Sequence, residues 1–178
     1  MTSNDPINVI QDAFVEQYGA ALKMLSNIIN KCPDSLWEDE KNGAAFYKII
    51  YHILYFADLY LSSTKEERSN FKPRFEFAED FSISKENFAS INWGKALSKE
   101  ECNLYLSDIR DKSQIFFSQL SMTELMSEPV FEWHSSSLLG SLIYNIRHIM
   151  LHIGALQGRL RMNGLEKQLW VSKSAIVF

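Results

Sequence analysis

Residues 138–161 read LLGSLIYNIRHIMLHIGALQGRLR, and their apolar residues recur at spacings of three and four. This period places them along one side of an α-helix. Ser136 or Ser137 is a suitable N-cap before the segment, and the Asn-Gly pair at 163–164 is a common helix stop. We therefore expect a helix from about Leu138 to Met162. At about 1.5 Å per residue it would be roughly 37 Å long, enough to run the length of a helical bundle.

Three further segments are expected to be helical, at about Ile7–Lys31, Gly43–Ser63 and Lys99–Leu120. Asp5 before Pro6 is a typical start for the first of them. The second is apolar on nearly all sides, which predicts deep burial, and Asn42 is its expected N-cap. Ser98 and Glu101 form a capping box at the start of the third. No segment alternates for long enough to build a sheet.

The chain is therefore predicted to be all-α, with one four-helix-bundle domain over residues 1–178. Helix periodicity allows both up-down-up-down and up-down-down-up order. The connection between the second and third helices, residues 64–97, is long enough to join two parallel helices. It is also too aromatic for a solvated linker, with Phe71, Phe75, Phe77, Phe81, Phe88 and Trp93. We expect it to cover either the open side of a site or the end of the bundle.

Composition excludes several functional classes. The net charge is −4 and the basic residues are scattered, so no basic patch favours nucleic acid or a membrane surface. No stretch of about 18 uncharged apolar residues occurs, and the N-terminus lacks the pattern of a secretory signal. Cys32 and Cys102 are far apart in sequence and form no metal or redox motif. A reduced, cytoplasmic protein is the expectation.

The four histidines provide the strongest functional signal. His148 and His152 stand four residues apart, so their side chains lie one turn apart on one helix face. His52 lies in the middle of the most apolar predicted helix. A buried imidazole without a partner is costly, and three neutral imidazoles plus water form the open site expected of catalytic zinc. We therefore expect His52, His148 and His152 to bind one divalent metal ion.

Simpler interpretations of these histidines exist. An HxxxH pair alone is more often two unrelated residues, and a core histidine such as His52 is usually hydrogen-bonded. Other metal sites fit less well. Ile149 stands where a zincin needs its glutamate, and the ExxH motifs of a di-iron bundle are absent. Imidazole ligands suit zinc, nickel, copper and iron alike.

Four other residues are secondary candidates for the site. Asn145 could orient a ligand or form an inter-helix hydrogen bond. Arg159 could meet an anionic substrate or lie in a surface ion pair. Tyr55 could place a hydroxyl near the metal or pack in the core. His134 lies roughly 20 Å from His148 along the predicted helix, so we exclude it as a ligand.

Two stretches of the chain resemble the DinB/YfiT-like superfamily, whose members are four-helix bundles. One is residues 138–161, and the other is residues 32–61, CPDSLWEDEKNGAAFYKIIYHILYFADLYL. The most specific part is HIMLHIGALQGRLR, in which HxxxH is followed by glycine, glutamine and arginine. Members of the superfamily carry one histidine on the second helix and an HxxxH pair on the fourth.

The resemblance implies an up-down-down-up bundle, the ligand set His52, His148 and His152, zinc or nickel as the ion, and a homodimer. It also implies a metal-dependent enzyme that activates water or a small thiol on a small-molecule substrate, as a thiol-S-transferase or hydrolase. No catalytic base is identifiable in the sequence. Two alternatives are a non-catalytic metal-binding or ligand-sequestering stress-response protein, and a bundle with vestigial histidines that acts through its surface as a dimer.

Overall fold

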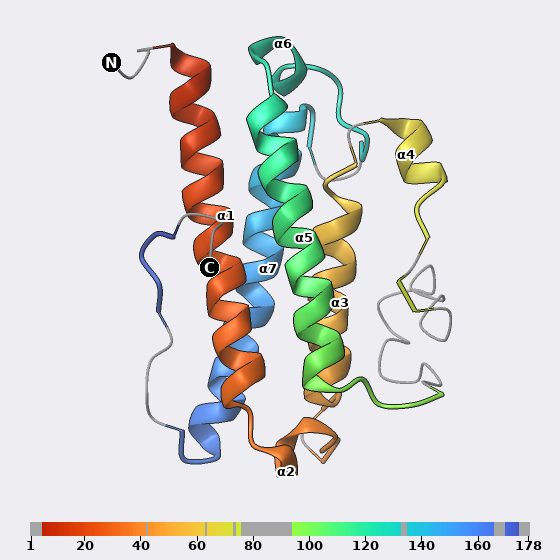
Figure 1. The fold of residues 1–178 in the computed structure, drawn as a ribbon, viewed down its shortest axis with the longest axis vertical. Helices are drawn as coiled ribbons and strands as arrows, with labels where there is room; N and C mark the ends of the chain where they lie inside the picture. The colour runs from red at the N-terminus through yellow and green to blue at the C-terminus, as the bar shows by residue number, and fades with distance from the viewer. Residues whose placement is uncertain are drawn as a thin grey trace.

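Helices dominate the part of the chain that the structure describes (Figure 1). The computed structural model describes residues 5–41, 43–62, 64–72, 74–75, 94–132, 135–165 and 170–174. Within these ranges lie α1 (Pro6–Lys31), α2 (Asp34–Trp37), α3 (Phe46–Leu59), α4 (Lys65–Ser69), α5 (Lys99–Gln119), α6 (Met122–Leu125) and α7 (Leu138–Met162). The same ranges contain no strand, so the prediction of an all-α protein is confirmed for them.

The four long helices α1, α3, α5 and α7 lie side by side along the long axis of the molecule (Figure 1). In this view α1 and α7 run downwards, whereas α3 and α5 run upwards. Helix α1 packs against α5 and α7, and α3 packs against the same two helices. Each long helix thus has one parallel and one antiparallel neighbour. The pair α3 and α7 is antiparallel.

Three of the long helices begin at predicted cap residues. The Asp5 side chain caps α1, and Ser98 and Glu101 form the predicted capping box of α5. Of the two serines considered for α7, Ser137 is the N-cap. Gly164 follows the end of α7 with φ of +85°, a left-handed conformation that favours glycine. Local sequence signals therefore set these helix ends.

Helix α3 is shorter than predicted at both ends. It begins at Phe46 rather than Gly43 and ends at Leu59 rather than Ser63. The predicted N-cap Asn42, like Ser63, lies outside the described residues. Gly43 has φ of +109°, which is incompatible with a helix that starts there. The prediction of Gly43 as the first helical residue was therefore wrong.

Arg159 of α7 holds the chain that precedes α3. Its guanidinium donates to the Ala44 carbonyl at 2.5 Å and to the Asp39 carbonyl at 3.2 Å. The same group lies 4.5 Å from the centroid of the Phe46 ring. These carbonyls are bonded to a side chain rather than to helical amides. A contact between distant parts of the chain therefore helps to set the start of α3.

Side chains from two other helices bond to a carbonyl near the C-terminal end of α3. The Leu61 amide donates to the Asp58 carbonyl at 3.1 Å and so does not extend the α-helical pattern to Ala57. The Ala57 carbonyl instead accepts from Tyr18 of α1 at 3.2 Å and from Asn145 of α7 at 3.4 Å. The last carbonyls of a helix lack helical partners. Here the partners come from across the bundle, which explains why α3 ends early.

The side chain of Asp58 is bonded to α5. Its carboxylate accepts from the Lys112 ammonium at 2.6 Å and from the Tyr105 hydroxyl at 2.9 Å. Lys112 also donates to the Asp58 backbone carbonyl at 3.0 Å. The Lys112 side chain is only 40% exposed because it reaches α3.

One continuous cluster of buried apolar residues draws on all four long helices. Its largest fully buried side chains include Tyr51 on α3 and Phe117 on α5. The Phe117 ring stacks beside Phe14 at 5.3 Å and meets the edge of Tyr18 at 5.2 Å. Among the described residues, none of the helices combines the length and apolar character that a membrane span requires.

The connection between α3 and α5 is described only in part. Helix α4 lies within it, and Phe71 contacts the Tyr55 ring at 5.3 Å. Phe75 packs on Tyr51 at 5.8 Å and on Tyr105 at 6.3 Å, so it covers the seam between α3 and α5. The other aromatic residues of the segment, Phe77, Phe81, Phe88 and Trp93, lie outside the described residues. Phe75 therefore packs against the bundle core, and the expectation that the segment covers a site or the end of the bundle stays a prediction.

Replacing Phe117 with alanine should test the core. Phe117 is fully buried, so we expect Phe117→Ala to lower the free energy of unfolding by about 3–5 kcal/mol. Ile115 lies on the same helix but is 60% exposed, so Ile115→Ala should change it by no more than about 0.5 kcal/mol. Urea unfolding followed by circular dichroism measures both values. Equal losses in the two variants would contradict the assigned core.

Candidate metal centre

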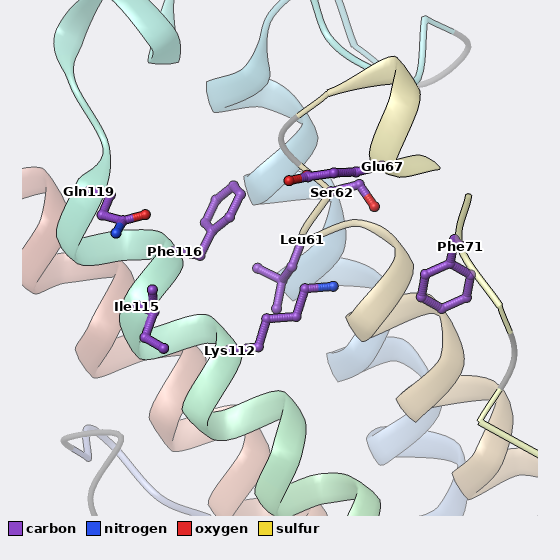
Figure 2. Close-up of a pocket in the computed structure, with 8 residues that line it drawn as sticks. All are labelled: Leu61, Ser62, Glu67, Phe71, Lys112, Ile115, Phe116 and Gln119. Atoms are coloured by element: carbon purple, nitrogen blue, oxygen red, sulfur yellow. The ribbon is translucent and has the colours of Figure 1, made fainter. Parts of the chain in front are cut away.

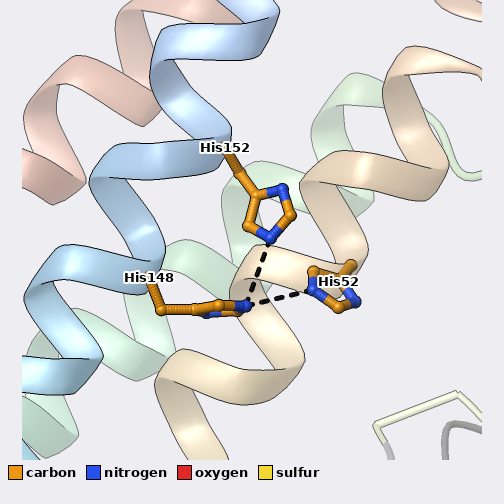
Figure 3. Close-up of side chains that lie close together, drawn as sticks. All are labelled: His52, His148 and His152. Atoms are coloured by element: carbon orange, nitrogen blue, oxygen red, sulfur yellow. Dashed lines mark hydrogen bonds between the residues drawn. The ribbon is translucent and has the colours of Figure 1, made fainter. Parts of the chain in front are cut away.

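His52, His148 and His152 come together between α3 and α7 (Figure 3). The Nε2 atom of His148 lies 3.1 Å from Nε2 of His52 and 3.2 Å from Nε2 of His152. One nitrogen from each of the three rings lies within 4.8 Å of the other two. Helix α7 supplies two rings one turn apart, and α3 supplies the third from the opposite side. The predicted cluster therefore forms.

The spacing of these nitrogens fits one metal ion. Two imidazole nitrogens bound to zinc at about 2.0–2.1 Å lie about 3.3–3.4 Å apart if the geometry is tetrahedral. At right angles, as in octahedral coordination, the same bond lengths place them about 2.9 Å apart. The two Nε2 separations of 3.1 and 3.2 Å fall between these values. These two separations therefore match two pairs of ligands on one ion, and the third pair of nitrogens lies within 4.8 Å.

Hydrogen bonding alone explains the cluster less well. A ring nitrogen of histidine either donates one hydrogen or accepts with one in-plane lone pair. Nε2 of His148 has two neighbouring ring nitrogens, one from His52 and one from His152. It can form a well-aligned hydrogen bond with only one of them at a time. A shared cation satisfies all three lone pairs together, and the donor set therefore fits a metal.

Aromatic side chains form one wall of the cluster. Phe56 lies 4.7 Å from the His52 ring, and Tyr144 lies nearly parallel to His148 at 6.2 Å. Tyr60 lies 6.2 Å from His148 and 5.7 Å from Tyr144. Burial raises the pKa of Tyr60, and the neighbouring Tyr144 raises it further. This hydroxyl therefore stays protonated at neutral pH.

The two tyrosines were not predicted as part of the site. A signal was present in the sequence, because Tyr144 precedes His148 by one turn and Tyr60 follows His52 by two turns. Helical spacing puts such residues on the same face as the histidines. Aromatic residues are so frequent in this chain that spacing alone did not single these two out.

The one acidic residue of α3 is not part of the histidine cluster. All three histidines are partly exposed. Asp58 is the one acidic residue of α3, and Lys112 and Tyr105 of α5 hold its carboxylate. It is therefore not directed at the histidines. No carboxylate of the described residues joins the three histidines as a possible ligand.

The structure also places the secondary candidates. Asn145 is fully buried and forms the inter-helix hydrogen bonds described above. Arg159 binds backbone carbonyls near the start of α3, so neither the anion site nor the surface ion pair describes it. Tyr55 packs among aromatic rings and is partly buried. His134 lies outside the described residues, and Cys32 and Cys102 are buried free thiols.

A separate cavity lies between α5 and the chain that follows α3 (Figure 2). Its volume is about 490 Å³, and it is lined by Leu61, Ser62, Glu67, Phe71, Lys112, Ile115, Phe116 and Gln119. None of these residues belongs to the histidine cluster. The Lys112 ammonium is bound to Asp58, which compensates its charge. The lining residues come from three separate segments without a shared motif, so the sequence did not predict this cavity.

Comparisons of the chain with models of known protein families, with curated proteins and with solved structures found no match. The resemblance to the DinB/YfiT-like superfamily therefore stays a prediction. The geometry of the histidines is independent of it.

Metal binding should depend on pH in the range where histidine titrates. Burial lowers the pKa of His152, so its ring stays in the neutral, ligand-competent form at neutral pH. We expect Zn²⁺ affinity to vary little at neutral pH and to fall as the pH drops below about 6, where protons compete for imidazole. Calorimetric titration at several pH values measures this. An affinity that stays constant well below that pH would exclude histidine ligands.

Proposed function

We propose that this protein binds one divalent transition-metal ion through His52, His148 and His152 and uses it to act on a small molecule. The observation that carries the proposal is the convergence of three Nε2 atoms, with His148 Nε2 lying 3.1 and 3.2 Å from the other two. Zinc or nickel is the proposed ion, since both accept imidazole ligands.

The ligand set supports a reactive rather than a purely structural site. Structural zinc sites are closed by four protein ligands, whereas catalytic sites commonly keep three protein ligands and one open position. Only three ligand residues come together here among the described parts of the chain. When bound, a divalent ion with neutral ligands supplies a Lewis acid that lowers the pKa of water or of a thiol.

The protein's own residues would bind and orient the second reactant. Phe56 and Tyr144 offer apolar ring surface beside His52 and His148. Partial exposure of the histidines leaves room for a small molecule to approach. We infer that a substrate rests against this aromatic wall with its reactive atom toward the three nitrogens. A thiol-S-transferase or a hydrolase would both use such an arrangement.

Membership of the DinB/YfiT-like superfamily is part of this proposal. Three observations support it: the directions of the four long helices, one histidine on α3, and an HxxxH pair on α7. The homodimer that the resemblance implies also stays a prediction. Light scattering at micromolar concentration would test it, and a monomer would remove it.

A non-catalytic role is the second candidate. The α3 carboxylate, Asp58, is bonded to α5, and no carboxylate of the described residues joins the histidine cluster. This observation favours a protein that stores or senses a metal or sequesters a ligand. Metal content separates both candidates from a bundle with vestigial histidines. Turnover on a panel of small thiols and esters then separates an enzyme from a binding protein.

Metal content of variants provides the direct test of the ligands. Protein purified without a histidine tag should contain about one zinc or nickel ion per chain, and His52→Ala, His148→Ala and His152→Ala should each lose most of it. Removing one of three ligands leaves too few protein bonds for a stable site. Mass spectrometry of the purified proteins measures the content.

His134→Ala is the matched control, because it removes a histidine that we exclude as a ligand. It should retain the metal content of the unchanged protein. Full metal content in His52→Ala would show that α3 contributes no ligand.

A further inference from the structure

Buried hydrogen bonds join α3 and α7, the two helices that carry the histidines, to each other and to α1. Asn145 of α7 donates through Nδ2 to the Tyr18 hydroxyl at 3.2 Å and to the Ala57 carbonyl at 3.4 Å. The Tyr18 hydroxyl donates to the same carbonyl at 3.2 Å. Because a carbonyl can only accept, Nδ2 rather than Oδ1 of Asn145 must face Ala57. Asn145 and Tyr18 are 0% and 1% exposed, so water does not compete for these bonds.

The distance along the helix from these hydrogen bonds to the histidines is the same on α3 and on α7. Since α3 and α7 are antiparallel, the chain runs from Ala57 back to His52 in the same direction as from Asn145 forward to His148 and His152. At about 1.5 Å per residue, His52 lies about 7.5 Å from the level of Ala57. His148 and His152 lie about 4.5 and 10.5 Å from the level of Asn145. His52 is thus level with the midpoint of the HxxxH pair.

We propose that Asn145 is a positioning residue that sets the register of α7 against α3 and so brings the three histidines to one point. The inference rests on the proposed metal site. A shift of α7 by one residue would move both of its histidines about 1.5 Å along the axis, which is large compared with a metal–nitrogen bond of about 2 Å.

The apolar contacts between α3 and α7 cannot fix this register alone. Ile53 on α3 and Ile149 and Ile153 on α7 are fully buried, and aliphatic contacts tolerate small displacements. A buried amide differs, because its hydrogen bonds form only at one register and an unmade bond is costly. Single buried asparagines fix helix register in coiled coils by the same principle.

The buried amide is otherwise unfavourable. Asn145 Oδ1 is buried and has no hydrogen-bond partner among the described residues. A leucine of similar size would avoid that cost and fit the surrounding core. The position of the amide therefore points to a gain in specificity rather than in stability.

Cobalt binding by the full, untagged chain tests the proposal, because the d–d absorption of Co²⁺ reports coordination geometry. We expect Asn145→Leu to keep its helical content but to bind Co²⁺ at least about tenfold more weakly, with an altered d–d spectrum. Tyr18→Phe is the matched control. It removes a hydroxyl from the same buried group but leaves the Asn145–Ala57 bond, so its Co²⁺ affinity and spectrum should stay close to those of the unchanged protein.

A second variant covers the case in which Asn145→Leu does not fold. Asn145→Gln keeps both amide donors but places them one methylene farther from α7, so it should fold and show a shifted Co²⁺ spectrum. Unchanged affinity and spectrum in whichever of the two Asn145 variants folds would overturn the positioning role while leaving the metal site in place. Absence of Co²⁺ binding by the unchanged protein would overturn the proposed function and this inference with it.

Discussion

The polar groups of helix α3 need hydrogen-bond or ion-pair partners inside the bundle, and the rest of the structure depends on this constraint. The helix is apolar on nearly all sides and packs between α5 and α7. Its polar groups meet partners from four different parts of the chain: Lys48 meets Glu40, His52 meets His148, Ala57 meets Tyr18 and Asn145, and Asp58 meets Lys112 and Tyr105. A buried polar group without a partner is costly, so these contacts select one arrangement of the helices.

The cluster of His52, His148 and His152 is a consequence of that arrangement. His52 lies 96 residues before His148 in the sequence, so it meets the HxxxH pair only if α3 and α7 are antiparallel and in one register. Apolar packing supplies most of the stabilisation of such a pair, whereas directional contacts choose among alignments of similar packing quality. Because apolar packing and buried hydrogen bonds hold the two helices in place, the histidines themselves can be partly exposed. The buried hydrogen bonds at Ala57 and the buried isoleucines are separate from the partly exposed histidines.

The sequence predicted those parts of the protein that local signals control. Periodicity and capping residues located α1, α5 and α7, because helix ends there are set by neighbours such as Asp5, Ser98 and Ser137. The same reasoning failed at α3, whose ends depend on Arg159 and on side chains of other helices. Histidine was informative for the site because few residues of that type occur in the chain. The aromatic residues beside the histidines, Phe56, Tyr60 and Tyr144, could not be singled out, because many aromatic residues of this chain pack in the core.

The central claim is that one ion is held by three imidazoles at the seam of α3 and α7. X-ray absorption spectroscopy of the untagged, zinc-loaded protein tests it most directly, because it reports the atoms bound to the metal. The account predicts a first shell of light atoms at about 2.0–2.1 Å with outer scattering from three imidazole rings. A sulfur shell at about 2.3 Å, or a first shell without imidazole scattering, would contradict it.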